Sequence, residues 1–439
     1  MMRNILTQLQ QWKAKNNRKP LIINGARQVG KTYAIQEFAK SFSNSVYINF
    51  EEMTDVADIF VQDLDPLRIV SALALYTREK IESARTLIIF DEIQACPRAV
   101  TCLKYFCEKL PEHFIVSAGS LLGVKLRRGG VSFPVGKVEF MDLLPMSFFE
   151  FLEAVNEAQL RQYLESKPTK VEEPFHQRLL DLLKTFFCVG GMPEAVATYV
   201  RTKDLNEVRQ VQMNILRSYE LDFSKYATPT EVIKIAEVWK ILPSQMAKEN
   251  KKFVFSAISQ SARAREYRSA LQWLYDAGLI YFAHNINTPK KPLSSYINLN
   301  AFKVYCLDVG LLAAKSHLDM RVLLQGDTLF TEFKGSLTEN YVAFVLASTM
   351  NRDELYYWTT GSGAEVDFII QLNNALYPLE VKAGLSREKK SLQRYHALYS
   401  PKAIIRTSQR NFEINGEFVN VPLYCLSQLE LIVHSLSEK

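Results

Sequence analysis

The segment that most constrains the fold is Gly25-Ala26-Arg27-Gln28-Val29-Gly30-Lys31-Thr32, which directly follows the apolar run 20–24. It matches the pattern GxxxxGK[ST], and residues 33–39 continue with helical spacing. Such a loop needs a buried strand before it and a helix after it, because backbone N–H groups and the helix N-terminus together surround the phosphates. The run therefore predicts that these eight residues bind ATP, with Lys31 on the β- and γ-phosphates and Thr32 on Mg²⁺. The alternative is a glycine turn without a ligand.

A second motif lies at the end of the apolar run 86–90, where Asp91 and Glu92 follow one another. An apolar strand that ends in two carboxylates is typical of the Walker B motif. Asp91 is then expected to hold Mg²⁺ through water, and Glu92 to polarise the water that attacks the γ-phosphate. The alternative is a solvated strand end without chemistry.

A third apolar run, 113–120, ends in small hydroxyl residues. Folds of this kind place a polar group that senses the γ-phosphate at that end, and Ser117 and Ser120 are the candidates, with Ser120 preferred. Either serine serves equally well as a turn residue. Cations follow in and beside the glycine-bearing segment 126–137, and any one of them is a candidate for stabilising charge on the transferred phosphoryl group: Lys125, Arg127, Arg128 and Lys137. For each of them a solvated basic loop is the alternative.

With these motifs the chain resembles AAA-type ATPases of bacteria and archaea that carry GARQVGKT-like loops. The likeness includes a DEIQ-type Walker B motif at 91–94, the element 119–123, and the stretches 132–136 and 144–148. The resemblance implies an α/β fold with a P-loop parallel sheet and a helical lid. In the family an arginine usually follows the Pro-Val-Gly of the stretch 132–136. Here the residue is Lys137, which lacks the planar, bidentate guanidinium, so the role of the finger shifts toward Arg127 or Arg128.

Length and composition predict several domains. A chain of 439 residues with 48% hydrophobic and 23% charged residues is too long for one core and has ample material for buried cores. We expect a P-loop core at 1–147, a helical lid at 148–228, a winged-helix domain at 229–325 and a nuclease-like domain at 326–439. The six scattered cysteines, and the lack of a signal peptide or a long apolar run, favour a cytoplasmic protein with reduced thiols.

The segment 229–325 reads as helices followed by a strand hairpin, which is the order of a winged helix. Basic residues on its expected helices and wing make DNA a candidate partner, and the net charge of +6 permits one. Those residues are Lys248, Lys251, Lys252, Arg263, Arg265, Arg268, Lys290 and Lys291. Many winged helices pack only against protein, and basic helix faces are commonly just solvated, so both interpretations stay open.

A second chemical constellation lies near the C-terminus, where Asp367 and the pair Glu380 and Lys382 fall on two adjacent predicted strands joined at 373–374. Strand alternation turns Glu380 and Lys382 to the same side. Two carboxylates and a lysine at one sheet end are what metal-dependent phosphodiester hydrolysis needs. Asp367 and Glu380 would hold Mg²⁺, Lys382 would position or deprotonate the water, and Glu339 would complete the site from a helix.

This stretch resembles the restriction-endonuclease-like, or PD-(D/E)xK, nucleases, and a domain of this kind usually follows the ATPase in the family named above. Val366 stands where the motif nominally has proline. Glu365, two residues from Asp367, shares its strand face and remains an alternative ligand. A salt-bridged sheet end without catalysis is the alternative for the whole cluster, because such cores also serve as binding platforms.

The sequence therefore predicts an ATP-binding and ATP-hydrolysing AAA-type protein that couples its nucleotide state to a DNA-directed, Mg²⁺-dependent nuclease domain. One alternative is a nucleotide-dependent switch whose nuclease-like domain only binds nucleic acid or protein. Another is a remodeller of protein partners. An arginine finger supplied by a neighbouring subunit would require a homo-oligomer.

Overall fold

The computed structural model describes residues 2–127, 132–166, 170–247, 252–260, 262–320, 324, 331–360, 363–383 and 390–437. The chain forms two compact units. Unit 1 comprises Met1–Leu144 with Asp276–Gly278, and unit 2 comprises Pro145–Tyr275 with Leu279–Lys439. The expected boundary near residue 147 lies close to the end of the first unit, whereas the expected boundary near residue 325 lies inside the second. The four-domain division stays a prediction.

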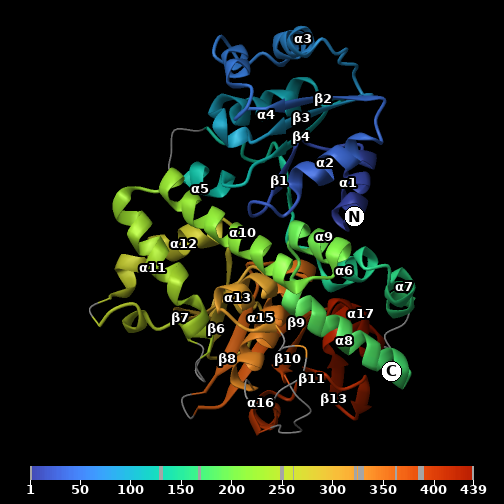
Figure 1. Ribbon diagram of the computed structural model, residues 1–439, viewed down its shortest axis with the longest axis vertical. Helices are drawn as coiled ribbons and strands as arrows, with labels where there is room; N and C mark the ends of the chain where they lie inside the picture. Colours follow the sequence, from blue (N-terminus) through green and yellow to red (C-terminus); the bar gives the residue numbers. More distant parts are fainter. Residues whose placement is uncertain are drawn as a thin grey trace. The chain divides into compact units, whose positions relative to one another are not determined.

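Unit 1 is built on a five-stranded parallel sheet in the order β2-β3-β4-β1-β5 (Figure 1). Its strands are β1 (Leu21–Asn24), β2 (Asn44–Asn49), β3 (Thr86–Asp91), β4 (Phe114–Ala118) and β5 (Glu139–Asp142). Every residue of β3 and β4 is buried, as expected for strands covered by helices on both faces. The predicted α/β fold with a parallel sheet is confirmed.

One helix precedes these strands and others connect them. They are α1 (Ile5–Ala14), α2 (Lys31–Ala39), α3 (Pro66–Thr77), α4 (Pro97–Lys109) and α5 (Leu122–Arg127), with 3₁₀ turns η1 (Thr54–Phe60) and η2 (Ile93–Ala95). A core of aliphatic and aromatic side chains, among them Ile22, Ile88 and Phe90, fixes the strands to the helices. Because the strands are parallel, their carboxyl ends lie at one edge of the sheet, and the loops that follow β1, β3 and β4 meet there.

Unit 2 begins with helices, as the apolar periodicity of residues 148–225 predicts. They are α6 (Phe148–Ala154), α7 (Ala158–Ser166), α8 (Glu173–Val189), α9 (Pro193–Thr202) and α10 (Leu205–Tyr226), and α11 (Pro229–Met246), η3 (Phe255–Ala257) and α12 (Ala264–Asp276) follow. The chain turns between α8 and α9 at Gly190, whose φ of 73° is easily adopted only by glycine. The role of α6 to α10 as a lid stays a prediction.

Asp308 ties this turn to the next helix, α13 (Val309–Lys315). Its carboxylate accepts hydrogen bonds from the N–H groups of Gly191, at 2.6 Å, and Leu311, at 2.8 Å, and so caps α13. A Cβ atom on Gly190 would lie 2.3 Å from Asp308 Oδ1, so only glycine permits this contact. The Gly190-Gly191 pair therefore has a packing role.

The second sheet has eight strands in the order β12-β13-β11-β10-β9-β8-β6-β7 (Figure 1). They are β6 (Ile280–Ile286), β7 (Ile297–Cys306), β8 (Tyr356–Thr359), β9 (Glu365–Leu372), β10 (Ala375–Val381), β11 (Ile404–Ser408), β12 (Glu413–Asn415) and β13 (Phe418–Pro422). The hairpin expected as a wing is present as β6 and β7, with η4 (Leu293–Tyr296) between them. It is not a separate wing, because β6 pairs with β8 and continues the sheet.

Helices α15 (Thr331–Thr349), α16 (Lys390–Tyr399) and α17 (Leu429–Ser437), with η6 (Leu423–Gln428), complete unit 2. Strands β8, β9 and β10 are antiparallel neighbours, whereas β11 returns parallel to β10 after α16. The order from α15 onward is therefore one helix, three antiparallel strands, a helix and a parallel strand. Trp358, Val366 and Tyr395 belong to the core that holds α16 on this sheet.

Candidate sites: a phosphate-binding loop and a carboxylate–lysine cluster

The loop between β1 and α2 has the backbone that the motif predicts. Gly30, at the N-terminus of α2, has φ 92°, and Gly25 has φ 150°. A Cβ atom on Gly25 would lie 2.2 Å from the Leu143 carbonyl oxygen, so the loop passes too close to its neighbour for any side chain there. The Lys31 ammonium donates hydrogen bonds to the carbonyl oxygens of Gly25, at 2.9 Å, and Ala26, at 2.8 Å. It thus lies folded back over the loop.

Lys31 is a buried cation. Burial lowers the pKa of its side chain to about 8, although the nearby carboxylates Glu92 and Asp91 act in the opposite direction. A negatively charged ligand that accepts hydrogen bonds from Lys31 would stabilise the charged form of its side chain, since charge-assisted hydrogen bonds in a buried site are strong. The loop therefore favours an anionic ligand.

The two Walker motifs come together at Thr32 and Asp91, although β4 separates β1 from β3. The Thr32 hydroxyl donates to Asp91 Oδ2 over 2.7 Å, and the Tyr47 hydroxyl donates to the same oxygen over 2.8 Å. A hydroxyl and a carboxylate are hard oxygen ligands of the kind Mg²⁺ prefers, and this ion commonly takes one or two such groups together with phosphate and water. The donor set fits the predicted ion.

Glu92 follows Asp91 with a left-handed backbone, φ 48°, at the end of β3. Its Oε2 accepts hydrogen bonds from Gln94 Nε2 and, over 3.4 Å, from the Ser120 hydroxyl. Ser117 lies within β4, where its buried hydroxyl has no hydrogen-bond partner among the described residues. Of the two serines, Ser120 contacts the predicted base. Sequence reasoning missed Gln94 as its second partner.

The structure describes only some of the residues predicted to act as an arginine finger. Arg128 and the side chain of Arg127 lie outside the described residues. Lys137 pairs with Glu108 over 3.0 Å. The ordinary role of a surface ion pair accounts for Lys137, and the identity of the finger stays a prediction.

The C-terminal constellation gathers around a lysine that sequence reasoning missed. Lys303 of β7 is fully buried, and its Nζ lies 3.1 Å from Glu339 Oε1, 2.6 Å from Glu365 Oε1 and 3.9 Å from Asp367 Oδ1. The Tyr305 hydroxyl donates to the same oxygen of Glu339. Glu339 is thus held inside the protein by two partners. The available signal was a charged residue within the apolar strand 301–307, since lysine is rarely buried unless paired.

The remaining predicted residues lie beside this group. Lys382 Nζ pairs with Glu380 Oε1 over 2.9 Å, in agreement with the expected shared face. Asp367 Oδ2 accepts the Val381 N–H over 2.8 Å. This contact lies just beyond the last β9–β10 pair, which joins Phe368 to Leu379. Glu380 Oε2 is buried and has no hydrogen-bond partner among the described residues. The structure therefore brings all four predicted residues into one cluster.

Charges in the cluster shift one another. Burial by itself would lower the pKa of Lys303, but Glu339, Glu365 and Asp367 outweigh it and hold that pKa well above its ordinary value. Burial raises the pKa of Glu380, and the neighbouring Lys382 opposes this shift. Lys303 therefore stays charged at any physiological pH, whereas Glu380 is the member that most needs an additional cation.

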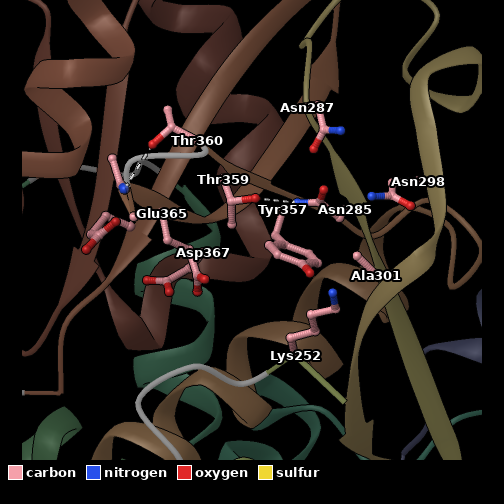
Figure 2. A pocket seen from close by; sticks show the side chains of 13 residues that line it. Lys252, Asn285, Asn287, Asn298, Ala301, Tyr357, Thr359, Thr360, Glu365 and Asp367 are labelled. Carbon is pink, nitrogen blue, oxygen red and sulfur yellow. Dashed lines mark hydrogen bonds between the residues drawn. The ribbon is translucent and has the colours of Figure 1, made fainter. Parts of the chain in front are cut away.

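A polar cavity of 920 Å³ opens onto these carboxylates. Figure 2 shows Glu365 and Asp367 on one side of it, with Asn287, Asn298 and Lys252 across from them. Asn285 and Thr359 also line it, and the Asn285 amide donates to the Thr359 hydroxyl over 3.0 Å. A cavity of this size accommodates a ligand of nucleotide dimensions, and its amides and hydroxyls offer both donors and acceptors.

The predicted metal ligands Asp367 and Glu380 both line this cavity. Within the described ranges, no three His, Cys, Asp or Glu side chains are arranged to hold a metal ion. The two carboxylates nevertheless fit one ion, because Mg²⁺ is commonly bound by one or two carboxylates with substrate phosphate and water. The unpartnered Glu380 oxygen is the observation that favours this fit.

The basic residues expected to face DNA are only partly described. Arg268 donates to Asn300 Oδ1 over 3.2 Å, and Lys291 donates to the Asn374 carbonyl oxygen over 2.6 Å. Lys248 and Lys251 lie outside the described residues. DNA contact by this surface stays a prediction.

Three protein-family models match separate parts of the chain. Residues 17–152 match an AAA domain, residues 180–321 match a domain of unknown function, DUF8612, and residues 334–426 match another, DUF4143. The first match and the fold agree, and unit 1 is a P-loop AAA-type domain. The other two models describe no activity.

Two curated relatives are uncharacterized proteins, one of Mycobacterium bovis and one of Mycobacterium tuberculosis. Each is 29% identical over 124 residues, which cover 27% of this chain and 27% of the relative. The alignment thus spans about a quarter of the relatives' length.

Among solved structures, the chain is similar to a Walker-type ATPase, PABY2304, of Pyrococcus abyssi, with 13% identity and a TM-score of 0.44 over 72% of this chain and 95% of that one. It is also similar to the ORC2 protein of Aeropyrum pernix in ADPNP-ADP complexes, with 15% identity and a TM-score of 0.35 over 76% and 94%. Neither likeness carries a functional conclusion for this chain.

No helix in the described parts of the chain is both long enough and apolar enough to cross a membrane.

Proposed function

We propose that this chain binds and hydrolyses ATP with Mg²⁺ and uses its nucleotide state to control a C-terminal domain that cleaves DNA. The observation that carries the ATPase part is the convergence of Lys31, Thr32 and Asp91 at one edge of the unit 1 sheet. The AAA-domain match over residues 17–152 supports the same assignment.

In the ATPase site, each group has one task. Lys31 leaves the carbonyl oxygens of its own loop and donates to the β- and γ-phosphates, while the N–H groups of the loop surround them. Thr32 and Asp91 would hold a Mg²⁺ ion, which would supply charge that neutralises the phosphates. Glu92 then orients the attacking water and accepts its proton, and Gln94 and Ser120 keep the Glu92 carboxylate in place.

In the C-terminal site, Asp367 and Glu380 would hold one Mg²⁺ ion, which would supply Lewis-acid chemistry for phosphodiester hydrolysis. Lys382, 2.9 Å from Glu380, positions the water or takes its proton. Support for this assignment comes from three observations: the cavity at the carboxylates, the unpartnered Glu380 oxygen, and the helix, three-strand, helix, strand order from α15 onward.

DNA is the proposed substrate because the cavity is lined by amides, hydroxyls and Lys252, and because the chain has a net charge of +6. Such groups hydrogen-bond to base edges, sugars and phosphates rather than to an apolar ligand. If a neighbouring subunit supplies the arginine finger, the proposal also requires a protein partner, which can be a second copy of this chain.

The second candidate function is a nucleotide-dependent switch whose C-terminal domain binds nucleic acid or protein without cleaving it. One observation favours it: Glu339, one of the four predicted catalytic residues, is already paired with Lys303 and Tyr305 in the protein interior. A binding platform retains such pairs, because it never needs them for chemistry.

Phosphate release tests the ATPase assignment. We expect turnover by the wild-type chain with ATP and Mg²⁺, no turnover by Lys31→Ala, and ATP binding without turnover by Glu92→Gln. Lys315→Met serves as a matched control, because Lys315 belongs to unit 2 and contacts the Trp239 ring. Activity that survives both unit 1 substitutions would overturn the assignment. Specific activity that rises with protein concentration would indicate that assembly completes the site.

A further inference from the structure

Lys303 holds the position that a cation must fill in the C-terminal cluster. It lies between Phe302 and Val304 on β7, and its side chain is 1% exposed. Its ammonium lies within 4 Å of three carboxylates, which belong to α15 and β9. Glu339, on α15, is itself only 4% exposed.

A carboxylate buried as deeply as that of Glu339 requires a compensating charge, because an isolated ion in a protein interior is strongly destabilised. The Lys303 ammonium meets that need and also pairs with the partly exposed Glu365, and the Tyr305 hydroxyl adds a hydrogen bond to Glu339. The ammonium also lies 4.9 Å from the centre of the Tyr357 ring, an electrostatically favourable contact. Lys303 is therefore a fixed part of the site.

The charge of the cluster indicates how many further cations it takes. With all four carboxylates ionised, as they are when a metal ion is bound, Glu339, Glu365, Asp367 and Glu380 contribute −4, and Lys303 and Lys382 contribute +2, which leaves −2. One divalent ion balances this charge. Without Lys303 the net charge of the cluster would be −3, and a second ion would be attracted to the position that the Lys303 ammonium now occupies.

We infer that Lys303 acts as a built-in cation that takes the place of a second divalent ion, so that the C-terminal site binds one divalent ion, at Asp367 and Glu380. This inference rests on the proposed function. Phosphodiester-cleaving sites often use two ions about 3.5–4 Å apart, and a lysine ammonium at one of the two positions supplies charge without exchange with solvent. It also makes the hairpin β6–β7 a part of the C-terminal site.

Manganese titration by calorimetry tests the inference on the full chain, without nucleotide. All proteins carry Asp91→Asn, which weakens the metal site of unit 1. We expect one Mn²⁺ bound by this background chain, none after Asp367→Ala is added, and two after Lys303→Met is added. Lys315→Met is the matched control, because it removes a half-buried lysine that lies over Trp239 and away from the carboxylates, and it should still bind one ion.

Thermal unfolding gives a second readout that does not depend on activity. The unfolding temperature of the background chain should rise modestly from EDTA to Mn²⁺, because a single ion binds at Asp367 and Glu380 while Lys303 already compensates Glu339 and Glu365. That of Lys303→Met should fall by several degrees in EDTA and recover in Mn²⁺. If this variant does not fold, Lys303→Met with Glu339→Gln keeps the cluster charge at −2 and should fold in EDTA and bind one ion.

The outcomes separate the inference from the proposed function. Two Mn²⁺ ions at the C-terminal site of the background chain, or in the double variant, would overturn the role of Lys303 and leave the proposed cleavage standing. No ion in the background chain but one in Lys303→Met would support Lys303 as the built-in cation and contradict metal-dependent cleavage. An unchanged ion count in Lys303→Met would overturn the inference.

Discussion

The Thr32 hydroxyl, on the first turn of α2, donates a hydrogen bond of 2.7 Å to the Asp91 carboxylate at the end of β3. These residues lie 59 positions apart in the sequence, and β4 lies between β3, which ends at Asp91, and β1, which precedes the loop that leads to Thr32. The contact joins the phosphate-binding loop to the acidic strand end. Its two oxygens belong to the residues proposed to hold Mg²⁺, Thr32 directly and Asp91 through water.

Lys31→Ala should weaken ATP binding about 10- to 100-fold, because the substitution removes charge-assisted hydrogen bonds worth roughly 1.5–3 kcal/mol. Calorimetric titration with a non-hydrolysable ATP analogue measures this change. Lys40→Ala is a suitable control, since Lys40 is an exposed lysine just past the C-terminus of the same helix and pairs with Glu37. Equal affinities for Lys31→Ala and the wild type would contradict the assigned loop.

ATP binding should depend on pH around the lowered pKa of Lys31, about 8. In the nucleotide-free protein this ammonium loses its proton as pH rises through 8, whereas bound phosphates hold the proton in place. Affinity should therefore be constant below pH 7, fall by up to about tenfold per pH unit above pH 8, and be accompanied by proton uptake. Calorimetry in buffers of different ionisation enthalpy measures the uptake. An affinity that is flat to pH 9.5 would refute this assignment.

Gln94→Ala should lower kcat about tenfold and leave KM for ATP nearly unchanged, because it releases the Glu92 carboxylate without touching the phosphates. Ser120→Ala should have a smaller effect, since its hydroxyl lies 3.4 Å from the same oxygen. Glu92→Gln should reduce kcat by at least about 100-fold. Steady-state phosphate release measures kcat for the three variants. A loss of kcat in Ser120→Ala greater than that in Gln94→Ala would contradict these expectations.

Asp308→Ala should destabilise unit 2 by about 1–3 kcal/mol, because it removes the N-cap of α13 and the acceptor of the Gly191 N–H. Burial raises the pKa of Asp308 to about 6, above that of the unfolded chain, so its contribution is greatest at low pH and is lost as pH rises through 6. The stability difference from the wild type should therefore widen from pH 7 to pH 5. Denaturant unfolding at the two pH values measures the free energy of unfolding of both proteins. A smaller difference between them at pH 5 than at pH 7 would exclude the raised pKa of Asp308.

Short sequence patterns predicted the structural elements that depend only on residues close together in the chain. The glycine positions of the 25–32 loop, the apolar run before Asp91 and the two-residue hairpin at Asn373 and Asn374 all appear as expected. Both asparagines have positive φ, 47° and 59°, as a tight hairpin turn requires. Such signals depend on neighbours within a few residues, so the sequence displays them directly.

Contacts set by topology were harder to predict. Lys303 meets Glu339 and Glu365 only because β6 pairs with β8 and brings β7 into the C-terminal sheet. The same hairpin pattern is compatible with a free wing, and the choice between them depends on pairing some seventy residues away in the sequence. The cluster residues Glu339, Asp367, Glu380 and Lys382 were found from spacing, but the cation at their centre required the sheet order.

Cleavage of labelled single-stranded, duplex and branched DNA with Mg²⁺, with and without ATP, tests whether nucleotide state controls a DNA-cleaving site. We compare the wild type with Lys382→Ala and with Lys315→Met as the control. We expect ATP-dependent cleavage by the wild type and the control, and cleavage reduced about 100-fold or more in Lys382→Ala. No cleavage of any substrate by a wild-type chain that hydrolyses ATP would contradict it and favour the switch.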